Sequence, residues 1–121
     1  MENKPTLIIG ASPNPTRYSY LATIKLAENG HTVYPLGIKS GKIGNHDIML
    51  SEISNVFIHT ITLYISQKHQ KQWEDYILKL KPKRIIFNPG AENEELFAKA
   101  SGQGIECLEA CTLVMLASGS Y

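Results

Sequence analysis

The sequence has few cysteines, no long apolar run and almost no net charge, and each shortage excludes a class of protein. Its 121 residues contain two cysteines, Cys107 and Cys111, whose spacing matches neither a C-x-x-C redox pair nor a full set of zinc ligands. No apolar stretch approaches the roughly 20 residues that a membrane-spanning helix needs, so we expect no membrane partner. The formal net charge of +1 gives no basis for binding nucleic acid through charge.

Metal-ligand patterns and a signal peptide are also missing. The four histidines, at positions 31, 46, 59 and 69, show no spacing such as H-E-x-x-H, and we expect no metal site. The first five residues lack the basic start and the apolar middle of a signal peptide, which predicts a cytoplasmic protein. Hydrophobic residues at 43% and charged residues at 19% are typical of a soluble globular chain, and we expect residues 1–121 to form one domain.

What the sequence does contain is short apolar runs that alternate with longer amphipathic stretches, a pattern typical of β-α-β units. We expect strands over residues 6–9, 31–36, 56–61, 84–88 and 105–108. We expect helices over 18–29, 66–80, 93–100 and 111–116, a helical turn at 49–53 and a loop at 37–47. Right-handed crossovers between five strands predict a single α/β, Rossmann-like, doubly wound domain, with a five-stranded parallel sheet of order 3-2-1-4-5 flanked by helices.

The most informative segment, Gly10 to Tyr20, follows the first strand directly. In doubly wound folds this is where the phosphates of a nucleotide are held. Gly10 permits a tight turn, Asn14 is expected to cap the next helix, and Pro15 suits its first position. The free amides of that helix and the positive end of its dipole predict an anion site. The loop is not the dinucleotide pattern G-x-G-x-x-G, because Ser12 and Pro15 replace two of its glycines.

A carboxylate is missing after the second strand, where an NAD-binding domain uses one to accept from the ribose hydroxyls. The segment carries Lys39 and Lys42 instead. A cation there suits a phosphorylated ribose, as in NADP or in coenzyme A (CoA), so that NAD is disfavoured. Solvated loop charges explain the two lysines equally well.

Other candidate groups have ordinary structural interpretations. Glu94 and Glu95 are adjacent, so they point about a hundred degrees apart on a helix and fail as a catalytic pair. Cys111, beside an apolar tail, and His59, inside an apolar run, are interpreted as packing residues rather than as nucleophile and base. The same interpretation, as partly buried helix or core residues, applies to Tyr18, Tyr20, Trp73 and Ile77.

Several motifs match a known family. The most specific is Gly10-Ala-Ser-Pro-Asn-Pro-Thr-Arg17 with Ser19-Tyr20. Weaker matches are Val33-Tyr-Pro35 with Lys39, Ile43-Gly44, Leu50-Ser-Glu-Ile53, Pro89-Gly90 with Asn93-Glu94-Glu95, and Cys111. On these residues the chain, from Thr6 to Leu116, resembles the small stand-alone CoA-binding domain proteins, which are similar to the CoA-binding domain of the succinyl-CoA synthetase α subunit. It departs from the family at Gly37-Ile38, where Asn-Pro is usual, and at Thr62-Leu63-Tyr64, where an arginine is often found.

The resemblance implies CoA binding, with the diphosphate along the first loop, Lys39 facing a phosphate and the end of the fourth strand bordering the ligand. The candidate ligand-binding residues are Gly10, Ala11, Ser12, Pro13, Asn14, Pro15, Arg17, Lys39, Asn88, Pro89 and Gly90.

Three functions remain open at this point. The first is a non-catalytic binding or regulatory module for CoA or an acyl-CoA, a nucleotide-type small molecule, acting as a homodimer or with a separate catalytic partner. The histidine that the synthetase phosphorylates lies in a further domain without a counterpart here, so the ligase reaction is not carried over and no catalytic residue is assigned. The second is an NADP-binding, reductase-like protein whose active site is completed at a subunit interface. In the third, the loop is vestigial and the protein acts through protein contacts alone.

Overall fold

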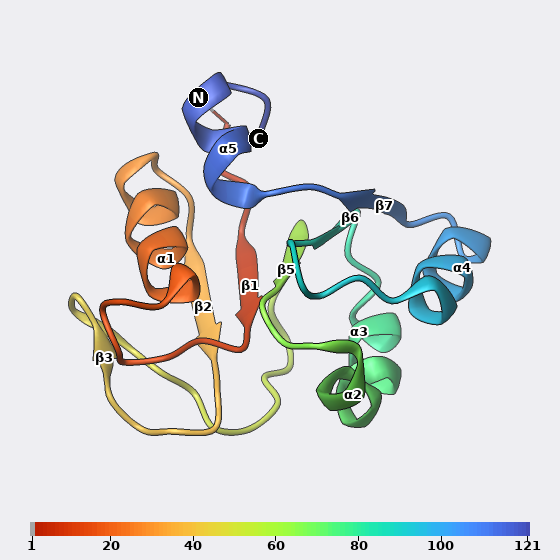
Figure 1. Ribbon diagram of the computed structural model, residues 1–121, viewed down its shortest axis with the longest axis horizontal. Coiled ribbons are helices and arrows are strands. Elements are labelled where there is room, and N and C mark those ends of the chain that lie inside the picture. Colours follow the sequence, from red (N-terminus) through yellow and green to blue (C-terminus); the bar gives the residue numbers. More distant parts are fainter. Residues whose placement is uncertain (1) are drawn as a thin grey trace.

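The computed structural model describes residues 2–121, in which a five-stranded parallel sheet lies between two layers of helices (Figure 1). The strands of this sheet are β1 (Thr6–Ile9), β2 (Val33–Leu36), β5 (Thr60–Leu63), β6 (Arg84–Phe87) and β7 (Glu106–Glu109). The helices are α1 (Tyr18–Glu28), α2 (Gln67–Gln70), the 3-10 helix η1 (Lys71–Trp73), α3 (Glu74–Leu80), α4 (Glu94–Gly102) and α5 (Thr112–Ser118). The predicted α/β, doubly wound fold class is confirmed.

The order across the sheet is β2-β1-β5-β6-β7, and every neighbouring pair is parallel. The predicted order 3-2-1-4-5, with strands numbered along the chain, places the third strand beside the second. That third strand is β5, and it pairs with β1 instead, with Thr6 opposite Thr60 and Ile9 opposite Leu63. Segment 37–59 therefore passes β1 without forming a crossover helix, and the sheet reverses its winding between β1 and β5.

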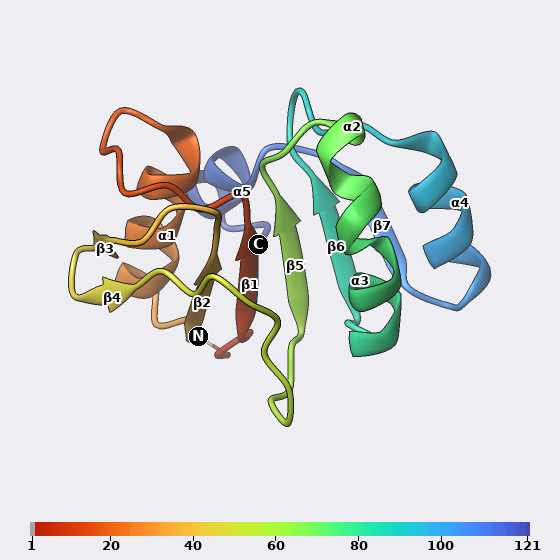
Figure 2. The ribbon, with the colours of Figure 1, turned by 90° about the horizontal axis from the view of Figure 1, so that it is seen from below.

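Two apolar clusters, one on each face, hold the sheet between the helices. Leu7 and Ile9 belong to the cluster that includes α3 and α4, whereas Ile8 points to the face covered by α1 and α5. Strands β1, β5 and β6 are buried along their whole length, as is typical of central parallel strands. Figure 2 shows α2 and α3 in front of β6, with α5 behind β1.

Helix α1 begins at Tyr18, the first residue of the expected range 18–29, but the residues before it do not cap it as the sequence predicts. Its N-cap residue is Arg17, whose side chain makes no capping hydrogen bond. The side chain of Asn14 instead accepts from the backbone N–H and the hydroxyl of Thr16, at 3.0 and 2.8 Å, and so forms a turn before the helix. The prediction that Asn14 caps the helix and that Pro15 opens it is therefore wrong.

Three connecting segments also differ from the prediction. Segment 37–47 holds a short antiparallel ribbon, β3 (Lys42–Ile43) and β4 (His46–Asp47), rather than a plain loop. Segment 49–53 is not helical, because Met49 forms an isolated parallel bridge with Leu36. The run 56–61 contributes only its last two residues to β5, and Phe57 within it is 59% exposed.

The start of α4 follows the prediction, since the side chain of Asn93 accepts from the N–H of Leu96 at 3.1 Å. Across residues 2–121 no helix combines the length and the apolar character needed to cross a membrane.

Candidate functional site

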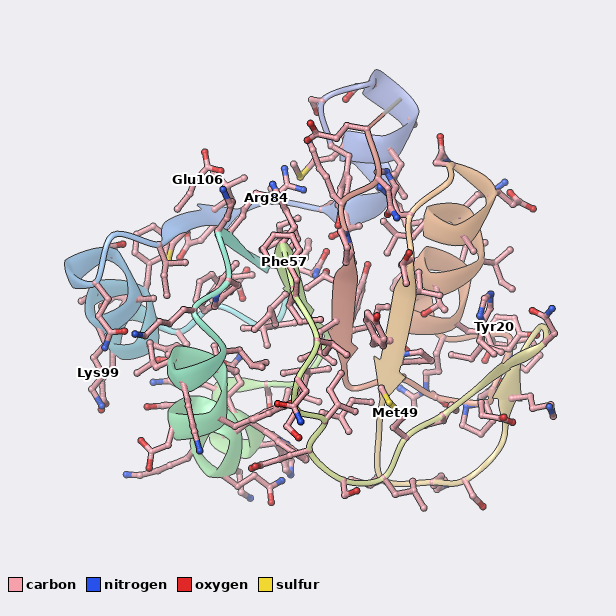
Figure 3. All side chains as sticks on the ribbon, turned by 180° about the vertical axis from the view of Figure 1, so that it is seen from behind. Tyr20, Met49, Phe57, Arg84, Lys99 and Glu106 are labelled. Atoms are coloured by element: carbon pink, nitrogen blue, oxygen red, sulfur yellow. The ribbon has the colours of Figure 1, made fainter. Side chains whose placement is uncertain are left out.

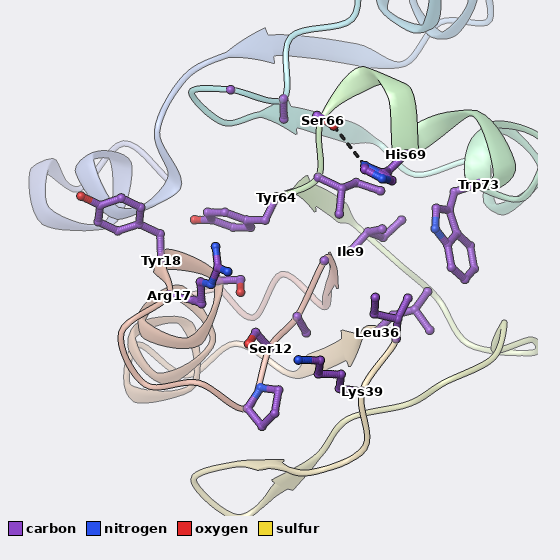
Figure 4. A pocket seen from close by; sticks show the side chains of 18 of the residues that line it. Ile9, Ser12, Arg17, Tyr18, Leu36, Lys39, Tyr64, Ser66, His69 and Trp73 are labelled. Carbon is purple, nitrogen blue, oxygen red and sulfur yellow. Dashed lines mark hydrogen bonds between the residues drawn. The ribbon is translucent and has the colours of Figure 1, made fainter.

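A cleft of about 660 Å³ opens at the carboxyl ends of β1, β2, β5 and β6 (Figure 4). This is the edge at which open parallel sheets bind ligands, beside the point where the winding reverses. The lining residues are Ile9, Gly10, Ala11, Ser12, Pro13, Arg17, Tyr18, Ser19, Leu36, Ile38, Lys39, Tyr64, Ile65, Ser66, His69, Gln72, Trp73, Pro89, Gly90 and Ala91.

Most of the candidate ligand-binding residues lie in this lining. They are Gly10, Ala11, Ser12, Pro13, Arg17, Lys39, Pro89 and Gly90. Asn14, Pro15 and Asn88 do not line the cleft. Asn14 and Pro15 are in the exposed turn before α1.

Asn88 is buried beneath the cleft and its polar atoms are bonded to the protein. Its amide donates to the hydroxyl of Thr62 at 2.7 Å and to the carbonyl oxygen of Leu63 at 2.9 Å. Its carbonyl oxygen accepts from the N–H of Thr112 at 2.9 Å. The side chain thus joins β5, β6 and α5.

Close contacts between backbones build the floor of the cleft. Gly10 has φ +98°, and a Cβ there would lie 2.7 Å from Cγ2 of Ile65. A Cβ on Gly37 would overlap the carbonyl oxygen of Ala11. The N–H groups of Gly10 and Ala11 both donate to the carbonyl oxygen of Leu36 at 3.0 Å. The two glycines therefore allow the loops that follow β1, β2 and β5 to contact one another. A residue with a Cβ at position 37 would displace the loop after β1.

The cleft carries two cations and no carboxylate. Arg17 and Lys39 line it, and both are exposed. Within residues 2–121 the side chain of neither one takes part in an ion pair. Lys42 points elsewhere and pairs with Asp47 at 3.0 Å across the β3-β4 ribbon. A negative ligand would therefore meet two charges that no group in the described part of the chain neutralises.

The amino end of α1 adds to this positive potential. Its first residues, Tyr18 and Ser19, line the cleft, and their N–H groups donate to no protein group in the described chain. The first turn of α1 contains no acidic residue. Free amides and the positive end of a helix dipole together bind phosphate-like anions.

The opposite wall comes from a break in the helix that the sequence predicts over residues 66–80. The structure divides it into α2, η1 and α3. The tighter 3-10 turn changes the angle between successive side chains, so that Trp73 leaves the buried stripe of Ile77. Trp73 packs partly against the core, but it also lines the cleft with His69 and Gln72. The interpretation of Trp73 as core packing alone is therefore wrong.

Two tyrosines stand on the other side of the cleft. Tyr18 is 74% exposed and lines the cleft, so its interpretation as a partly buried helix residue is wrong, whereas Tyr20 is partly buried as predicted. Tyr64 has a buried hydroxyl without a hydrogen-bond partner in residues 2–121. Burial raises the pKa of Tyr64, and its phenol is therefore neutral.

A buried glutamine holds two of the cleft loops together. The amide of Gln70 donates to the carbonyl oxygens of Ile65 and Ala91 at 2.9 and 2.7 Å. Its own oxygen accepts from the amide of Asn93 at 2.9 Å. Ile65 and Ala91 belong to the loops after β5 and β6, and both line the cleft. Sequence reasoning missed Gln70, since a glutamine in a polar helix carries no signal of burial.

The side chains that could take part in catalysis lie in three separate places. Ser66 and His69 approach at 3.2 Å, Oγ to Nδ1, but the cleft lining has no carboxylate to orient the imidazole ring. Cys111 is half-buried at the N-cap of α5 and is absent from the lining. His59 lies at the other end of the sheet, where it bonds the hydroxyl of Thr60 at 2.8 Å.

The sequence and the fold both resemble those of known proteins. The model of a family described as CoA binding domain matches residues 4–117. The crystal structure of an uncharacterized protein has a TM-score of 0.97 with 45% identity, and the match covers 100% of both chains. No curated protein matches the sequence.

Two further structures share the fold at low identity. A hypothetical protein from Pyrococcus horikoshii OT3 has a TM-score of 0.86 with 23% identity, covering 96% of this chain and 83% of that one. A protein from Thermus thermophilus has a TM-score of 0.85 with 16% identity, covering 98% of this chain and 91% of that one. Because the family model spans nearly the whole chain, the protein belongs to the CoA-binding domain family.

Proposed function

We propose that this protein binds CoA or an acyl-CoA in the cleft and acts as a non-catalytic binding or regulatory module. The observation that carries the proposal is the meeting of Arg17, Lys39 and the amino end of α1 in a cleft without a carboxylate. CoA supplies the matching charges, a diphosphate and a ribose phosphate. A regulatory role would act on a second copy of the chain or on a separate catalytic protein.

The residues present fit the phosphates of CoA. The diphosphate would lie over the first loop, near Arg17 and the hydroxyl of Ser12, where the amides of α1 are free. Lys39 follows β2, the strand whose end contacts the ribose in folds of this class, and would face the ribose phosphate. Pro89 and Gly90 would border the ligand from the loop after β6.

The NADP alternative uses the same two cations and is tested beside CoA. A reductase also needs a substrate site and a proton donor, and Ser66 with His69 is the pair that the cleft offers. No observation in this structure favours that reading over CoA, so NADP serves as a comparison ligand.

The proposal is tested by thermal unfolding in the presence of CoA, acetyl-CoA, NADP, NAD and ADP. A ligand that binds only the native state raises the unfolding midpoint, and the size of the rise ranks the ligands. We expect the largest rise in the midpoint with CoA or acetyl-CoA. The rise should be smaller with ADP, which lacks the 3′-phosphate on the ribose. A larger rise with NADP would favour the reductase, and a panel without any rise would refute both ligand hypotheses.

A further inference from the structure

The cleft has two unlike halves (Figure 4). The phosphate half holds Ser12, Arg17 and Lys39. The ring half holds His69 and Trp73 from the broken helix, and Figure 4 shows Leu36 across the cleft from Trp73. Ile38, which also lines the cleft, follows Leu36 by two residues. A ligand that fills both halves must be anionic at one end and flat or apolar at the other. The proposed ligand has two parts besides its diphosphate, a purine nucleoside and a pantetheine arm, and the geometry distinguishes them.

The end of β2 sets the direction of the ligand. In sheets of this class, the residues that follow the second strand contact the ribose of the nucleotide whose diphosphate rests on the first loop. Here those residues are Leu36, Ile38 and Lys39. The base on that ribose then lies beside Ile38, on the side of the cleft that the α2–η1 segment closes. That places the base against Trp73.

The ring half suits a purine. Trp73 is fixed from behind, since it packs on the core cluster and its ring centroid lies 6.2 Å from that of Tyr76. Its cleft side is free to stack on a flat ring. Gln72, from the same 3-10 turn, carries both a donor and an acceptor that can read the edge of a base. Ile38 is 83% exposed, an unusual position for a large apolar side chain, and a bound base would cover it.

We propose that Trp73 stacks on the purine ring of the bound nucleotide and that Ile38 covers that ring from the opposite loop. The site recognises the 3′-phosphorylated purine nucleotide half of its ligand, and the pantetheine arm leaves past Tyr18. This inference rests on the proposed function and states which half of the ligand determines specificity.

The wild-type protein itself provides the test, because Trp73 is its single tryptophan and therefore its whole indole emission. The fluorescence is titrated with CoA and with the two halves of CoA, adenosine 3′,5′-bisphosphate and 4′-phosphopantetheine. We expect a saturable change with CoA and with the bisphosphate, and none with phosphopantetheine. A change with phosphopantetheine, or a change with CoA but with neither half, would overturn the stacking of the purine.

The same titration separates this inference from the proposed function. If CoA raises the unfolding midpoint without changing the emission of Trp73, the stacking is refuted while CoA binding stands. If CoA changes neither quantity, the proposed function fails as well.

Three variants quantify the contribution of the ring half. Trp73→Leu should weaken CoA binding about tenfold or more, as loss of a stacked base contact does, while Trp73→Phe keeps most of the affinity. Because Trp73 contacts the core, Ile38→Ala provides the variant without a folding hazard and should weaken CoA binding a few fold. Leu50→Ala is its matched control, since Leu50 is 54% exposed and lies outside the cleft lining. Equal CoA affinity for Ile38→Ala and wild type would refute the covering role of Ile38.

Discussion

The two ends of the parallel sheet both gather cations, but they use them in opposite ways. At the amino end, Lys4 and Arg84 donate to the backbone carbonyl oxygen of Tyr121, with the Arg84 contact at 3.4 Å. The Arg84 guanidinium also lies 4.3 Å from the centroid of the Tyr121 ring. At the carboxyl end, Arg17 and Lys39 line an open cleft and form no ion pair within residues 2–121.

This difference distinguishes structural cations from ligand-binding ones. Arg84 is 5% exposed, and Figure 3 places it at the far end of the sheet from Met49, which bridges the carboxyl end of β2. At the amino end the chain supplies hydrogen-bond and ring partners for both cations, although Nη2 of Arg84 has no partner within residues 2–121. At the carboxyl end the side chains of Arg17 and Lys39 line an open cleft, where an external anion can reach them. The positions of these cations in the sequence do not distinguish the two roles. The contacts that each side chain makes in the structure distinguish them.

The largest effect is expected where the carboxyl end depends on backbone contact rather than on charge. Gly10→Ala introduces strain at φ +98° and a Cβ that lies 2.7 Å from Ile65, so it should cost roughly 2–5 kcal/mol in unfolding free energy. Gly90→Ala is the matched control, since φ is +92° but no atom lies within 4 Å, and it should cost about 1–2 kcal/mol. Urea unfolding of both variants measures the difference. Equal losses would mean that the contact with Ile65 is unimportant.

A smaller loss is expected at the amino end. Arg84→Met removes the hydrogen bond to the hydroxyl of Thr60, at 3.1 Å, and both contacts with Tyr121. The unfolding free energy should fall by about 2 kcal/mol, while CoA affinity stays the same. Urea unfolding and calorimetric titration measure the two quantities. Weaker CoA binding by the folded variant would contradict the division between the two ends.

Arg17→Ala should show the reverse behaviour. Its side chain is exposed and makes no ion pair in the described chain, so the unfolding free energy should change by less than about 0.5 kcal/mol. CoA affinity should fall roughly tenfold, because one charge-assisted contact with the diphosphate is lost. Lys68→Ala, on the exposed surface outside the cleft lining, is the control. Unaltered CoA affinity in Arg17→Ala would refute the placement of the diphosphate.

Lys39→Ala tests the ribose phosphate with a more selective readout. Affinity for CoA should fall about fivefold, and affinity for dephospho-CoA should change little, since that ligand lacks the phosphate that Lys39 would face. Equal losses for both ligands would show that Lys39 does not read the ribose phosphate.

The smallest effect is a pH dependence that belongs to the amino end. Burial, then the charges of Lys4 and Arg84, lower the pKa of His31 from 6.5, and the folded protein therefore favours the neutral ring. Its contribution to stability is complete above pH 6.5 and is lost as the pH falls through the lowered pKa, because the unfolded chain then binds the additional proton. The unfolding free energies obtained from urea titrations at about pH 7.5 and 5.5 should differ more for wild type than for His31→Asn, and the excess should be less than about 1 kcal/mol. An identical pH response in both proteins would contradict this role of His31.

Local signals in the sequence predicted much of the fold. The apolar runs predicted β1 and β6, and Asn93 predicted the start of α4. Both kinds of element are signalled by residues that are close together in the sequence. The strand order depends on how segment 37–59 packs, and the position of β5 beside β1 was therefore not foreseen.

The candidate site shows the same division. The phosphate loop and Lys39 were found from local motifs and from their place after strands. The ring half was missed, because helical periodicity assigned Trp73 to the core and gives no sign of the 3-10 turn that redirects its side chain. Gly37 is visible in the sequence, but the carbonyl oxygen of Ala11 that requires it belongs to a different strand end.

The buried Gln70 determines when the entropy of the cleft walls is lost. Its hydrogen bonds to Ile65 and Ala91 join the loops after β5 and β6 during folding, before any ligand arrives. A ligand then meets a wall that is already ordered, and binding does not carry the entropic penalty of immobilising these two loops. The free energy of its contacts on this side is available as affinity, and adjustment to ligands of different shape is left to the exposed side chains of the opposite rim.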